Sequence, residues 1–421
     1  MTDDHPTALI SAIHHSGRQM VLAITGGGSS AIGELLRVPG GSSSLLEAVV
    51  PYSWSALIDW LGGQPDEACS ARTARAMAMA AFQRARRLAD ASVPLEKLVG
   101  VGCTASLASD RPKRGEHRFH LGFQTLAETR SISLTLQKGL RTRAEEEALV
   151  CELLLHDIAA MCGVKEGLLF AIDLLAPHLA PNPERLPQVP EIRNQADVQA
   201  MATPEMMQLM SGELAGVRYE RGRSFHLGPD ETLVRDTTRR LLQQPAPGPP
   251  VIFPGAFRPR HEGHLRMAEV ATRLLGRPVE FEISIENVDK PPLDYFDMRE
   301  RLKQFSGDEA IWLTCAPTFV EKSGLFPGAT FIVGADTILR IANPKYYRGE
   351  AALRDEAVGR IVERGCRFLV FGRLVDGAFE TLDDLQLPPA LAAICTPVPE
   401  REFRADISST ELRRQQEQQQ Q

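Results

Sequence analysis

Two histidines flank a glycine at the predicted start of a helix, in the string Pro254-Gly255-Ala256-Phe257-Arg258-Pro259-Arg260-His261-Glu262-Gly263-His264. Gly255 lets a ligand approach the backbone closely, and a helix N-terminus offers free N–H groups and a positive dipole end. Histidines three apart on a first turn can face one ligand. The pattern favours a polyphosphate ligand over zinc, because no third ligand stands at suitable spacing. Two capping or surface histidines would give the same string.

A second helix start lies near the C-terminal end, in the string Ile407-Ser408-Ser409-Thr410-Glu411-Leu412-Arg413. Ser408 and Glu411 have the spacing of a capping box, which predicts a helix N-terminus. The hydroxyls of Ser409 and Thr410 and the cation of Arg413 would then face a ligand together. A plain helix cap with a solvated arginine is the alternative interpretation.

Taken together, the two strings resemble the HxGH nucleotidyltransferase superfamily over about residues 250 to 414, and within it the nicotinamide/nicotinate-mononucleotide adenylyltransferases. The pattern G-x-F-x-P-x-H-x-G-H is matched by Gly255, Phe257, Pro259, His261, Gly263 and His264. The closing pattern I-S-S-T-x-x-R is matched by Ile407 to Thr410 and Arg413, and a middle G-A-D segment by Gly334-Ala335-Asp336.

The resemblance implies that ATP binds as its Mg²⁺ complex, with no metal site in the protein itself. His261 and His264 would hold the triphosphate, and His264 would stabilise charge on the transferring α-phosphate. Gly255, Phe257 and Gly263 would also belong to the ATP- and phosphate-binding residues, while Ser409, Thr410 and Arg413 would clamp the β- and γ-phosphates. Asp336 would contact the nucleoside. A mononucleotide phosphate is already a nucleophile, so positioning and charge stabilisation would suffice for catalysis.

Some residues depart from the family pattern or are additional to it. Arg258 and Arg260 add cations inside the first motif, where they would strengthen phosphate binding or favour a different acceptor. Lys290, in the segment 287–293, is a candidate contact to the substrate phosphate or else a solvated loop lysine. Trp312 lies in a predicted strand and is expected to be a core residue, so no tryptophan is assigned to stack on the acceptor base.

A glycine-rich loop, Thr25-Gly26-Gly27-Gly28-Ser29-Ser30, follows a predicted strand and opens a predicted helix. Successive free N–H groups in such a loop form an anion-binding nest. The loop has neither the GK[ST] of a Walker motif nor a GxGxxG pattern. A tight strand-to-helix turn without a ligand is the alternative.

The surrounding stretch, about residues 5 to 165, resembles the C-terminal domain of the CinA (competence/damage-inducible) family, the nicotinamide-mononucleotide amidases. Thr25 falls on the family's nucleophilic serine and Tyr52 on its motif tyrosine. Ile24 replaces an acidic residue, and Leu57 stands where a catalytic lysine is expected. A hydroxyl needs an adjacent base to attack an amide at neutral pH. We therefore expect a vestigial site at Thr25, Gly26, Gly27, Gly28 and Tyr52, without amidase activity.

Strand and helix patterns alternate on both sides of the Pro-rich run Gln243–Pro250, which predicts two α/β domains, the second a doubly wound parallel sheet of Rossmann-like type. We place a CinA-like domain at 1–165, a helical connector and Pro-rich linker at 166–250, a nucleotidyltransferase domain at 251–414, and a disordered Gln-rich tail at 415–421. The predicted strands are Met20–Thr25, Leu98–Gly102, His117–Gln124, Val251–Phe253, Val279–Ile285, Ala310–Cys315, Thr330–Val333 and Phe368–Phe371. The predicted helices are Ala31–Val38, Ala71–Ala89, Ala144–Met161, Gly263–Leu275, Tyr295–Phe305 and Ala351–Arg364.

Composition narrows the function classes. The chain has 421 residues with 47 basic and 54 acidic side chains, a formal charge of −7 that disfavours a nucleic-acid partner. It contains no run of 18 apolar residues and no signal peptide at its start, so we expect a cytoplasmic protein without a membrane partner. The seven scattered cysteines form no CxxC motif, which argues against disulfides and zinc.

The sequence therefore predicts transfer of AMP from ATP to a mononucleotide, NMN or NaMN, with release of pyrophosphate. Two alternatives remain at this stage. One is an adenylyl- or cytidylyltransferase for another phosphorylated acceptor such as phosphopantetheine, and the other is a nucleotide-sensing protein without catalysis. The sequence leaves open whether the chain forms a homo-oligomer.

Overall fold

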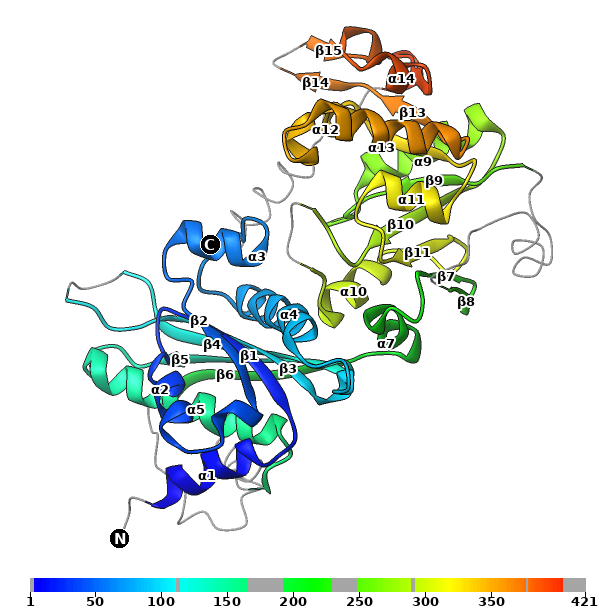
Figure 1. Cartoon of the computed structure of the whole chain (residues 1–421). Helices are drawn as coiled ribbons and strands as arrows, with labels where there is room; N and C mark the ends of the chain where they lie inside the picture. The colour runs from blue at the N-terminus through cyan, green and yellow to red at the C-terminus, as the bar shows by residue number, and fades with distance from the viewer. Residues whose placement is uncertain are drawn as a thin grey trace. The chain divides into compact units, whose positions relative to one another are not determined.

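The computed structural model describes residues 4–110, 114–165, 192–228, 248–288, 292–375 and 378–403 (Figure 1). The chain divides into two compact units. Unit 1 comprises Met1–Met207 and Asp289–Asp297, and unit 2 comprises Gln208–Val288 and Met298–Gln421. Each unit is built on one large mixed sheet with helices, which confirms the predicted pair of α/β domains.

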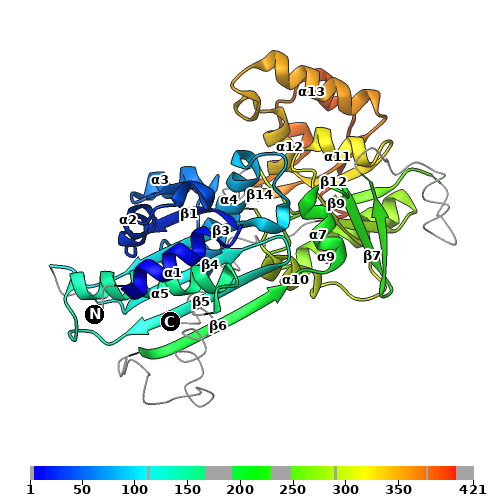
Figure 2. The same ribbon diagram turned by 60° about the horizontal axis from the view of Figure 1, so that its bottom comes forward.

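Unit 1 contains a six-stranded sheet in the order β2-β1-β3-β4-β5-β6. Strands β2, β1 and β3 are parallel, whereas β3, β4, β5 and β6 are joined by antiparallel pairing. Strand β6 runs beside β5 at the edge of the sheet (Figure 2). The strands are β1 (Gln19–Thr25), β2 (Leu45–Val49), β3 (Leu98–Ser106), β4 (His117–Gln124), β5 (Glu128–Leu136) and β6 (Ile192–Met201).

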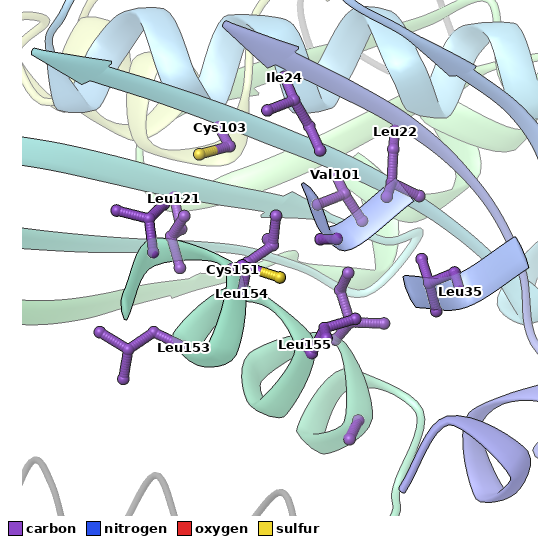
Figure 3. Close-up of a cluster of buried hydrophobic side chains, with 14 of the residues drawn as sticks. Leu22, Ile24, Leu35, Val101, Cys103, Leu121, Cys151, Leu153, Leu154 and Leu155 are labelled. Carbon is purple, nitrogen blue, oxygen red and sulfur yellow. The ribbon is translucent and has the colours of Figure 1, made fainter. Parts of the chain in front are cut away.

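Helix α4 (Ala71–Leu88) packs directly onto one face of this sheet. The approach needs glycine in the strands, since a Cβ atom on Gly102 would lie 2.2 Å from the carbonyl oxygen of Ala74. On the other face, α1 (Asp4–His14), α2 (Ser30–Arg37) and α5 (Arg143–Met161) enclose the apolar core of Figure 3. The remaining helical segments are α3 (Trp54–Leu61), α7 (Pro204–Ser211) and the 3₁₀ turns Gly41–Ser43 and Leu95–Lys97.

Unit 2 contains an eight-stranded sheet in the order β16-β13-β12-β9-β10-β11-β7-β8. The first six strands are parallel, and β7 and β8 add an antiparallel edge. This sheet has the predicted doubly wound, Rossmann-like arrangement. Its strands are β7 (Gly216–Glu220), β8 (Arg223–Leu227), β9 (Val251–Pro254), β10 (Val279–Ser284), β11 (Ile311–Thr314), β12 (Thr330–Gly334), β13 (Arg367–Phe371) and β16 (Cys395–Val398), with a separate hairpin of β14 (Arg373–Val375) and β15 (Ala378–Glu380).

The core of unit 2 gathers side chains of β9, β12 and β13 with those of α11, α12 and α13. Its largest buried members are aromatic, and Trp312 is fully buried among them, as the sequence predicts. Phe253 and Phe281 instead belong to an aromatic cluster with the loop that precedes α9. The helices are α9 (Glu262–Leu275), α10 (Tyr295–Leu302), α11 (Phe319–Leu325), α12 (Ala335–Ala342), α13 (Ala351–Glu363) and α14 (Pro389–Ala392), with 3₁₀ turns at Pro344–Tyr347 and Leu382–Asp384.

Residues 166–250 are predicted as a helical connector and linker, but the described part of this range contains three strands and one helix. Residues 192–228 form β6, α7, β7 and β8, and these strands extend the sheets of both units. Sequence patterns miss β6 because it lies at a sheet edge, where Val198 and Met201 are exposed and no apolar alternation is required. Residues 289–297 are a second departure, since they belong to unit 1.

Candidate nucleotidyltransferase site

The two histidines of the first motif lie where the sheet of unit 2 presents its carboxyl ends. Strand β9 ends at Pro254, and α9 begins at Glu262, directly after His261. Strand β12 pairs with β9, and exposed Asp336 stands in the first turn of α12 just beyond it. His261, His264 and Asp336 therefore follow neighbouring parallel strands at one edge, where doubly wound sheets bind ligands.

The two imidazole rings lie close together, and the backbone of His261 is hydrogen-bonded to the ring of His264. Their ring centroids lie 3.8 Å apart with the planes tilted by 31°. The backbone N–H of His261 donates to Nδ1 of His264 over 3.2 Å. Since Nδ1 accepts this bond, a neutral His264 carries its proton on Nε2. The fold thus fixes a tautomer whose Nε2–H is a hydrogen-bond donor.

Both histidines are neutral near pH 7. Burial, with smaller effects of His261 and Arg260, lowers the pKa of His264 to about 3. Burial also lowers the pKa of His261 from its ordinary value. The pair therefore offers N–H dipoles rather than full charges to an anion, together with the positive end of α9.

An aromatic cluster supports this loop from beneath. The ring of Phe257 lies 5.1 Å from that of His264 and makes edge contacts with Phe253, Phe281 and Phe305. Gly255 is required here, because a Cβ at that position would lie 2.5 Å from Cζ of Phe257. Phe257 is fully buried, with a positive φ of 43°. Gly255 and Phe257 therefore shape the loop from inside and present no side chain to a ligand.

Arg260 has a different place from the one expected. Its guanidinium lies 4.6 Å from the ring centroids of both Phe281 and Phe305, and it forms an ion pair with Glu309. Only 8% of its side chain is exposed. The prediction that Arg260 adds a phosphate-binding cation is therefore corrected, because this charge is already neutralised inside unit 2. The sequence signal was ambiguous, since a charged loop residue says nothing about its partner.

Gln304 belongs to the site and was missed by sequence reasoning. Its side-chain amide accepts a hydrogen bond from the backbone N–H of Arg260 at 2.7 Å and donates to the carbonyl of Phe257 at 2.9 Å. It thereby closes the loop that ends at His261. No local pattern marks such a residue, because its partners lie more than 40 positions away.

The remaining predicted ligands of this site, Lys290, Ser409, Thr410 and Arg413, lie outside the described residues. A groove of about 540 Å³ runs beside α9, lined by Leu265, Glu269, Arg218 and Glu280 among others, but neither histidine lines it. Within the described ranges, no group of three or more His, Cys, Asp or Glu side chains could hold a metal ion. No helix in that same part of the chain is long and apolar enough to cross a membrane.

The glycine-rich loop of unit 1 forms the predicted nest, and a carboxylate of the protein occupies it. Glu147 accepts hydrogen bonds from the backbone N–H groups of Gly28 at 2.8 Å and Ser30 at 3.3 Å, and from the hydroxyls of Ser29 and Ser30. Although burial raises the pKa of Glu147, the bonds to Gly28 and to the two serines leave it below its ordinary value. Sequence reasoning missed Glu147, because no pattern near Gly28 indicates a carboxylate 119 positions away.

The other residues predicted for the vestigial site differ in burial and packing. Thr25 ends β1 and is nearly buried, at 7% exposed. Gly26 needs its positive φ of 78° and its missing side chain, because a Cβ would lie 1.9 Å from the carbonyl oxygen of Ala105. Gly27 is crowded in a similar way by Leu107. Tyr52 is 71% exposed.

Position 57, where the family pattern places a lysine, lies in the apolar core. Leu57 is 2% exposed and clusters with Ala23, Leu61 and Met77. The residue at this position is therefore part of the apolar packing of unit 1.

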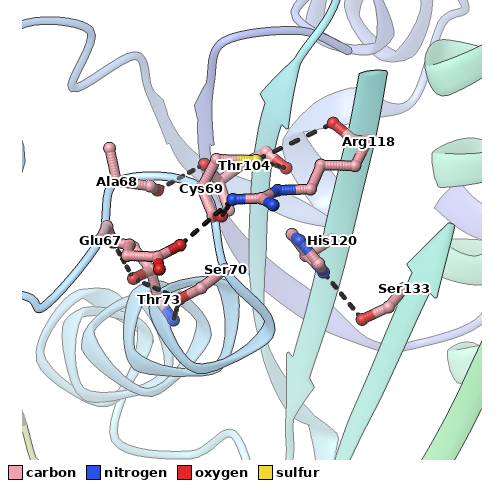
Figure 4. A network of polar contacts seen from close by, with 9 residues as sticks. All are labelled: Glu67, Ala68, Cys69, Ser70, Thr73, Thr104, Arg118, His120 and Ser133. Atoms are coloured by element: carbon pink, nitrogen blue, oxygen red, sulfur yellow. Dashed lines mark hydrogen bonds and ion pairs between the residues drawn. The ribbon is translucent and has the colours of Figure 1, made fainter. Parts of the chain in front are cut away.

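A polar network at the start of α4 contains two further side chains of types that often take part in catalysis, a histidine and a cysteine (Figure 4). Nδ1 of His120 is hydrogen-bonded to the hydroxyl of Ser133 at 2.8 Å, and burial lowers the pKa of His120 to about 4. Burial raises the pKa of Cys69, so its thiol is protonated near pH 7. Arg118 donates to the carbonyl of Cys69 and to Glu67. These contacts hold the start of α4 against β3 and β4.

Comparison with known proteins separates the two units. The family described as cytidylyltransferase-like matches residues 252–415. No curated protein sequence matches the chain. Solved structures that match include the competence/damage inducible protein CihA from Agrobacterium tumefaciens, at 20% identity over 37% of this chain and 94% of that one, with a TM-score of 0.30.

Two further structures of the same description match. A competence or damage-inducible protein from Enterobacter asburiae shares 15% identity over 37% of this chain and 98% of that one, with a TM-score of 0.30. A competence-damaged (CinA) superfamily protein from Escherichia coli shares 15% identity over 40% of this chain and 92% of that one, with a TM-score of 0.29.

Three observations agree on the C-terminal part of the chain: the HxGH string, its place before α9 at the carboxyl ends of a doubly wound sheet, and the family match over 252–415. The C-terminal part of the chain is therefore a cytidylyltransferase-like domain of the HxGH nucleotidyltransferase superfamily.

Proposed function

We propose that the protein transfers AMP from ATP to the phosphate of a pyridine mononucleotide, NMN or NaMN. An oxygen of the acceptor phosphate attacks the α-phosphorus of ATP, the bond to the β-phosphate breaks, and pyrophosphate leaves with that electron pair. The product is a dinucleotide. ATP would arrive with its own Mg²⁺, which neutralises charge on the β- and γ-phosphates.

The observation that carries this proposal is the fixed tautomer of His264. Its Nδ1 is engaged by the N–H of His261, so its Nε2–H is the group left to meet an oxygen of the transferring phosphate. A preorganised neutral donor costs no reorganisation as negative charge develops there. The acceptor phosphate is itself the nucleophile, so the reaction requires no protein nucleophile.

The choice of a pyridine mononucleotide rests on resemblance. The first motif is similar to that of the nicotinamide/nicotinate-mononucleotide adenylyltransferases, and the N-terminal stretch is similar to nicotinamide-mononucleotide amidases. Both resemblances point to the same class of acceptor. In the N-terminal unit we propose that amidase activity is absent, which is supported by apolar Leu57 in the core and by Glu147 in the loop of Thr25.

A pyrophosphate-release assay tests the proposal on the full chain. ATP or CTP with Mg²⁺ is offered with NMN, NaMN or phosphopantetheine in turn, and the product is identified by mass. We expect release with ATP and a pyridine mononucleotide, reduced about 10²–10³-fold in His264→Ala, because one aimed donor is lost. Exposed His15, in unit 1, supplies the matched control His15→Ala, which should keep full activity.

Each unexpected result would change the assignment. Release only with CTP would replace ATP as the nucleotide donor. Release only with phosphopantetheine would replace the pyridine mononucleotide as the acceptor. Full activity in a folded His264→Ala variant would remove His264 from the mechanism. No release with any pair would leave a nucleotide-binding protein without transferase activity.

A further inference from the structure

Arg260 directly precedes His261, and its backbone bears on the hydrogen bond that fixes the tautomer of His264. The N–H of His261 donates to Nδ1 of His264 over 3.2 Å. That N–H belongs to the planar peptide unit that joins Arg260 to His261. Its direction therefore depends on the backbone of Arg260 as much as on that of His261. Whatever holds Arg260 in place also aims this N–H.

Gln304 holds Arg260 by both its backbone and its side chain. The backbone N–H of Arg260 donates to Oε1 of Gln304 at 2.7 Å, and Nη1 of Arg260 donates to the carbonyl of Gln304 at 3.0 Å. The side-chain amide of Gln304 also donates to the carbonyl of Phe257 at 2.9 Å. Three hydrogen bonds from one residue therefore fix the loop immediately before His261.

The guanidinium of Arg260 is fixed further by two rings and one carboxylate. It lies 4.6 Å from the ring centroids of both Phe281 and Phe305. Its Nη1 donates to Oε2 of Glu309 at 2.9 Å, and its Nη2 donates to Oε1 of the same carboxylate. Paired bonds of this kind are geometrically specific, because the planar fork of arginine matches the two carboxylate oxygens.

Glu309 is itself held in place before it meets the arginine. Its Oε2 accepts hydrogen bonds from the backbone N–H of Ser306 at 2.8 Å and from the hydroxyl of Ser306 at 2.9 Å. The backbone N–H of Glu309 donates back to the carbonyl of Ser306 at 3.0 Å. Although burial raises the pKa of Glu309, its bonds to Arg260 and Ser306 leave it below the ordinary value. The carboxylate is therefore ionised near pH 7.

We propose that Gln304 and Glu309 are positioning residues of the transferase site, and that they act through Arg260 to aim the N–H that fixes His264. All of these residues lie in unit 2. An ion pair that serves stability alone can be replaced by apolar side chains without loss. A pair that sets the direction of a backbone N–H cannot be replaced in this way. The inference rests on the proposed function for its kinetic consequence, but not for its consequence for the tautomer.

The first measurement is the tautomer of His264 in the full-length protein, read from the chemical shifts of its ring nitrogens. The signals are assigned by their loss in His264→Leu. We expect the wild-type protein to carry the proton of His264 on Nε2 alone. In Arg260→Met and in Glu309→Gln the N–H of His261 is no longer aimed at Nδ1, so we expect a mixture of the two tautomers.

The second measurement separates kcat from KM in pyrophosphate release. A misaimed donor at Nε2 loses its effect on the charge that develops in the transition state, so Arg260→Met and Glu309→Gln should lower kcat about tenfold and change KM for ATP much less. The double variant Arg260→Met with Glu309→Met removes both charges, so its melting temperature should recover toward that of the wild type. Its kcat should stay low, because the fork is still missing.

Arg218 supplies the matched control within the same unit. Its side chain is 5% exposed, pairs with Glu220 and Glu280, and lies 5.7 Å from the ring centroid of Phe225. Arg218→Met therefore removes a buried arginine with the same kinds of partner as Arg260. It should lower the melting temperature in a similar way, while the tautomer of His264 and kcat stay unchanged.

The outcomes distinguish this inference from the proposed function. A proton that stays on Nε2 of His264 in both Arg260→Met and Glu309→Gln, or an equal mixture of tautomers in Arg218→Met, would overturn the positioning role. Recovery of kcat together with the melting temperature in the double variant would do the same. If Arg260→Met does not fold, Gln304→Leu, which removes bonds to the loop without leaving a charge unpaired, replaces it. If the wild-type protein releases no pyrophosphate, the proposed function fails, while the tautomers still decide the positioning role.

Discussion

Gly255→Ala should destabilise unit 2 and slow transfer, because the new methyl group meets the ring of Phe257. The ideal Cβ would lie 2.5 Å from Cζ, 2.8 Å from Cε1 and 2.9 Å from Cε2 of that ring. Carbon atoms in contact are usually about 3.5–4.0 Å apart, so the ring has to retreat by roughly 1 Å. Overpacking of this size costs about 1–3 kcal/mol in the free energy of unfolding.

The same movement reaches the site. The displaced ring packs edge-on against the imidazole of His264, and a misplacement of about 1 Å near reacting groups can lower a rate about 10²-fold. The assays are thermal unfolding monitored for unit 2 and pyrophosphate release at a temperature well below the transition. In Gly255→Ala, both the unfolding temperature of unit 2 and the rate of pyrophosphate release should fall.

A matched glycine isolates the effect. Gly359 lies within α13, and no atom outside the helix lies within 4 Å of the position that a Cβ would take, so Gly359→Ala should raise stability by about 0.5–1 kcal/mol and leave turnover unchanged. In a Phe257→Leu background the far end of the ring is gone, and Gly255→Ala should cost less than in the wild type. The reasoning is refuted if Gly255→Ala matches Gly359→Ala in both assays.

Further predictions concern the other charged and polar groups. Arg413→Ala should weaken ATP binding, measured by calorimetry, more than acceptor binding; intact ATP affinity would return that string to a plain helix cap. Glu147→Gln should lower the stability of unit 1 by about 1 kcal/mol at pH 7. Because folding lowers the pKa of Glu147, the difference in stability between this variant and the wild type should disappear as the pH falls through the pKa of Glu147 in the folded protein. Between pH 6.5 and 5 the unfolded chain protonates His264, whereas the folded protein, in which the pKa of His264 is about 3, does not. The free energy of unfolding should therefore fall by roughly 1.5 kcal/mol over that range from this group, and by less in His264→Leu. Ammonia release from NMN should be negligible and unchanged in Thr25→Ala; robust release lost in that variant would establish an active amidase.

The sequence predicts what depends on local pattern. Helix α9 is set by apolar spacing and by the glycine and histidines at its start, and its predicted and observed starts, Gly263 and Glu262, differ by one residue. Strand β4 is predicted with the bounds that the structure has, because Phe119, Leu121 and Phe123 stand at alternate positions along it. The nest of residues 25–30 is likewise local, since consecutive N–H groups and glycine conformations suffice to form it.

What the sequence does not predict depends on partners far along the chain. Nothing near Arg260 indicates that Glu309 neutralises it, and nothing near Gly28 indicates that Glu147 fills the nest 119 positions away. Strand β6 is not predicted from the sequence, because an edge strand with an exposed face lacks the apolar alternation on which strand prediction depends. In each case the missing information is the three-dimensional neighbour.

Helix α4 packs closely on the sheet of unit 1. Its backbone lies directly on the sheet, with no side chain of Gly100, Gly102 or Gly122 between, so helix and sheet cannot slide without a clash of main-chain atoms. Alanine at any of these three glycines would bring a Cβ atom within 2.5 Å of a backbone oxygen of α4, a clash that no side-chain adjustment relieves. Glycine is therefore required by the close approach of α4 to β3 and β4, and alanine at any of these positions should push the helix away from the sheet and destabilise unit 1.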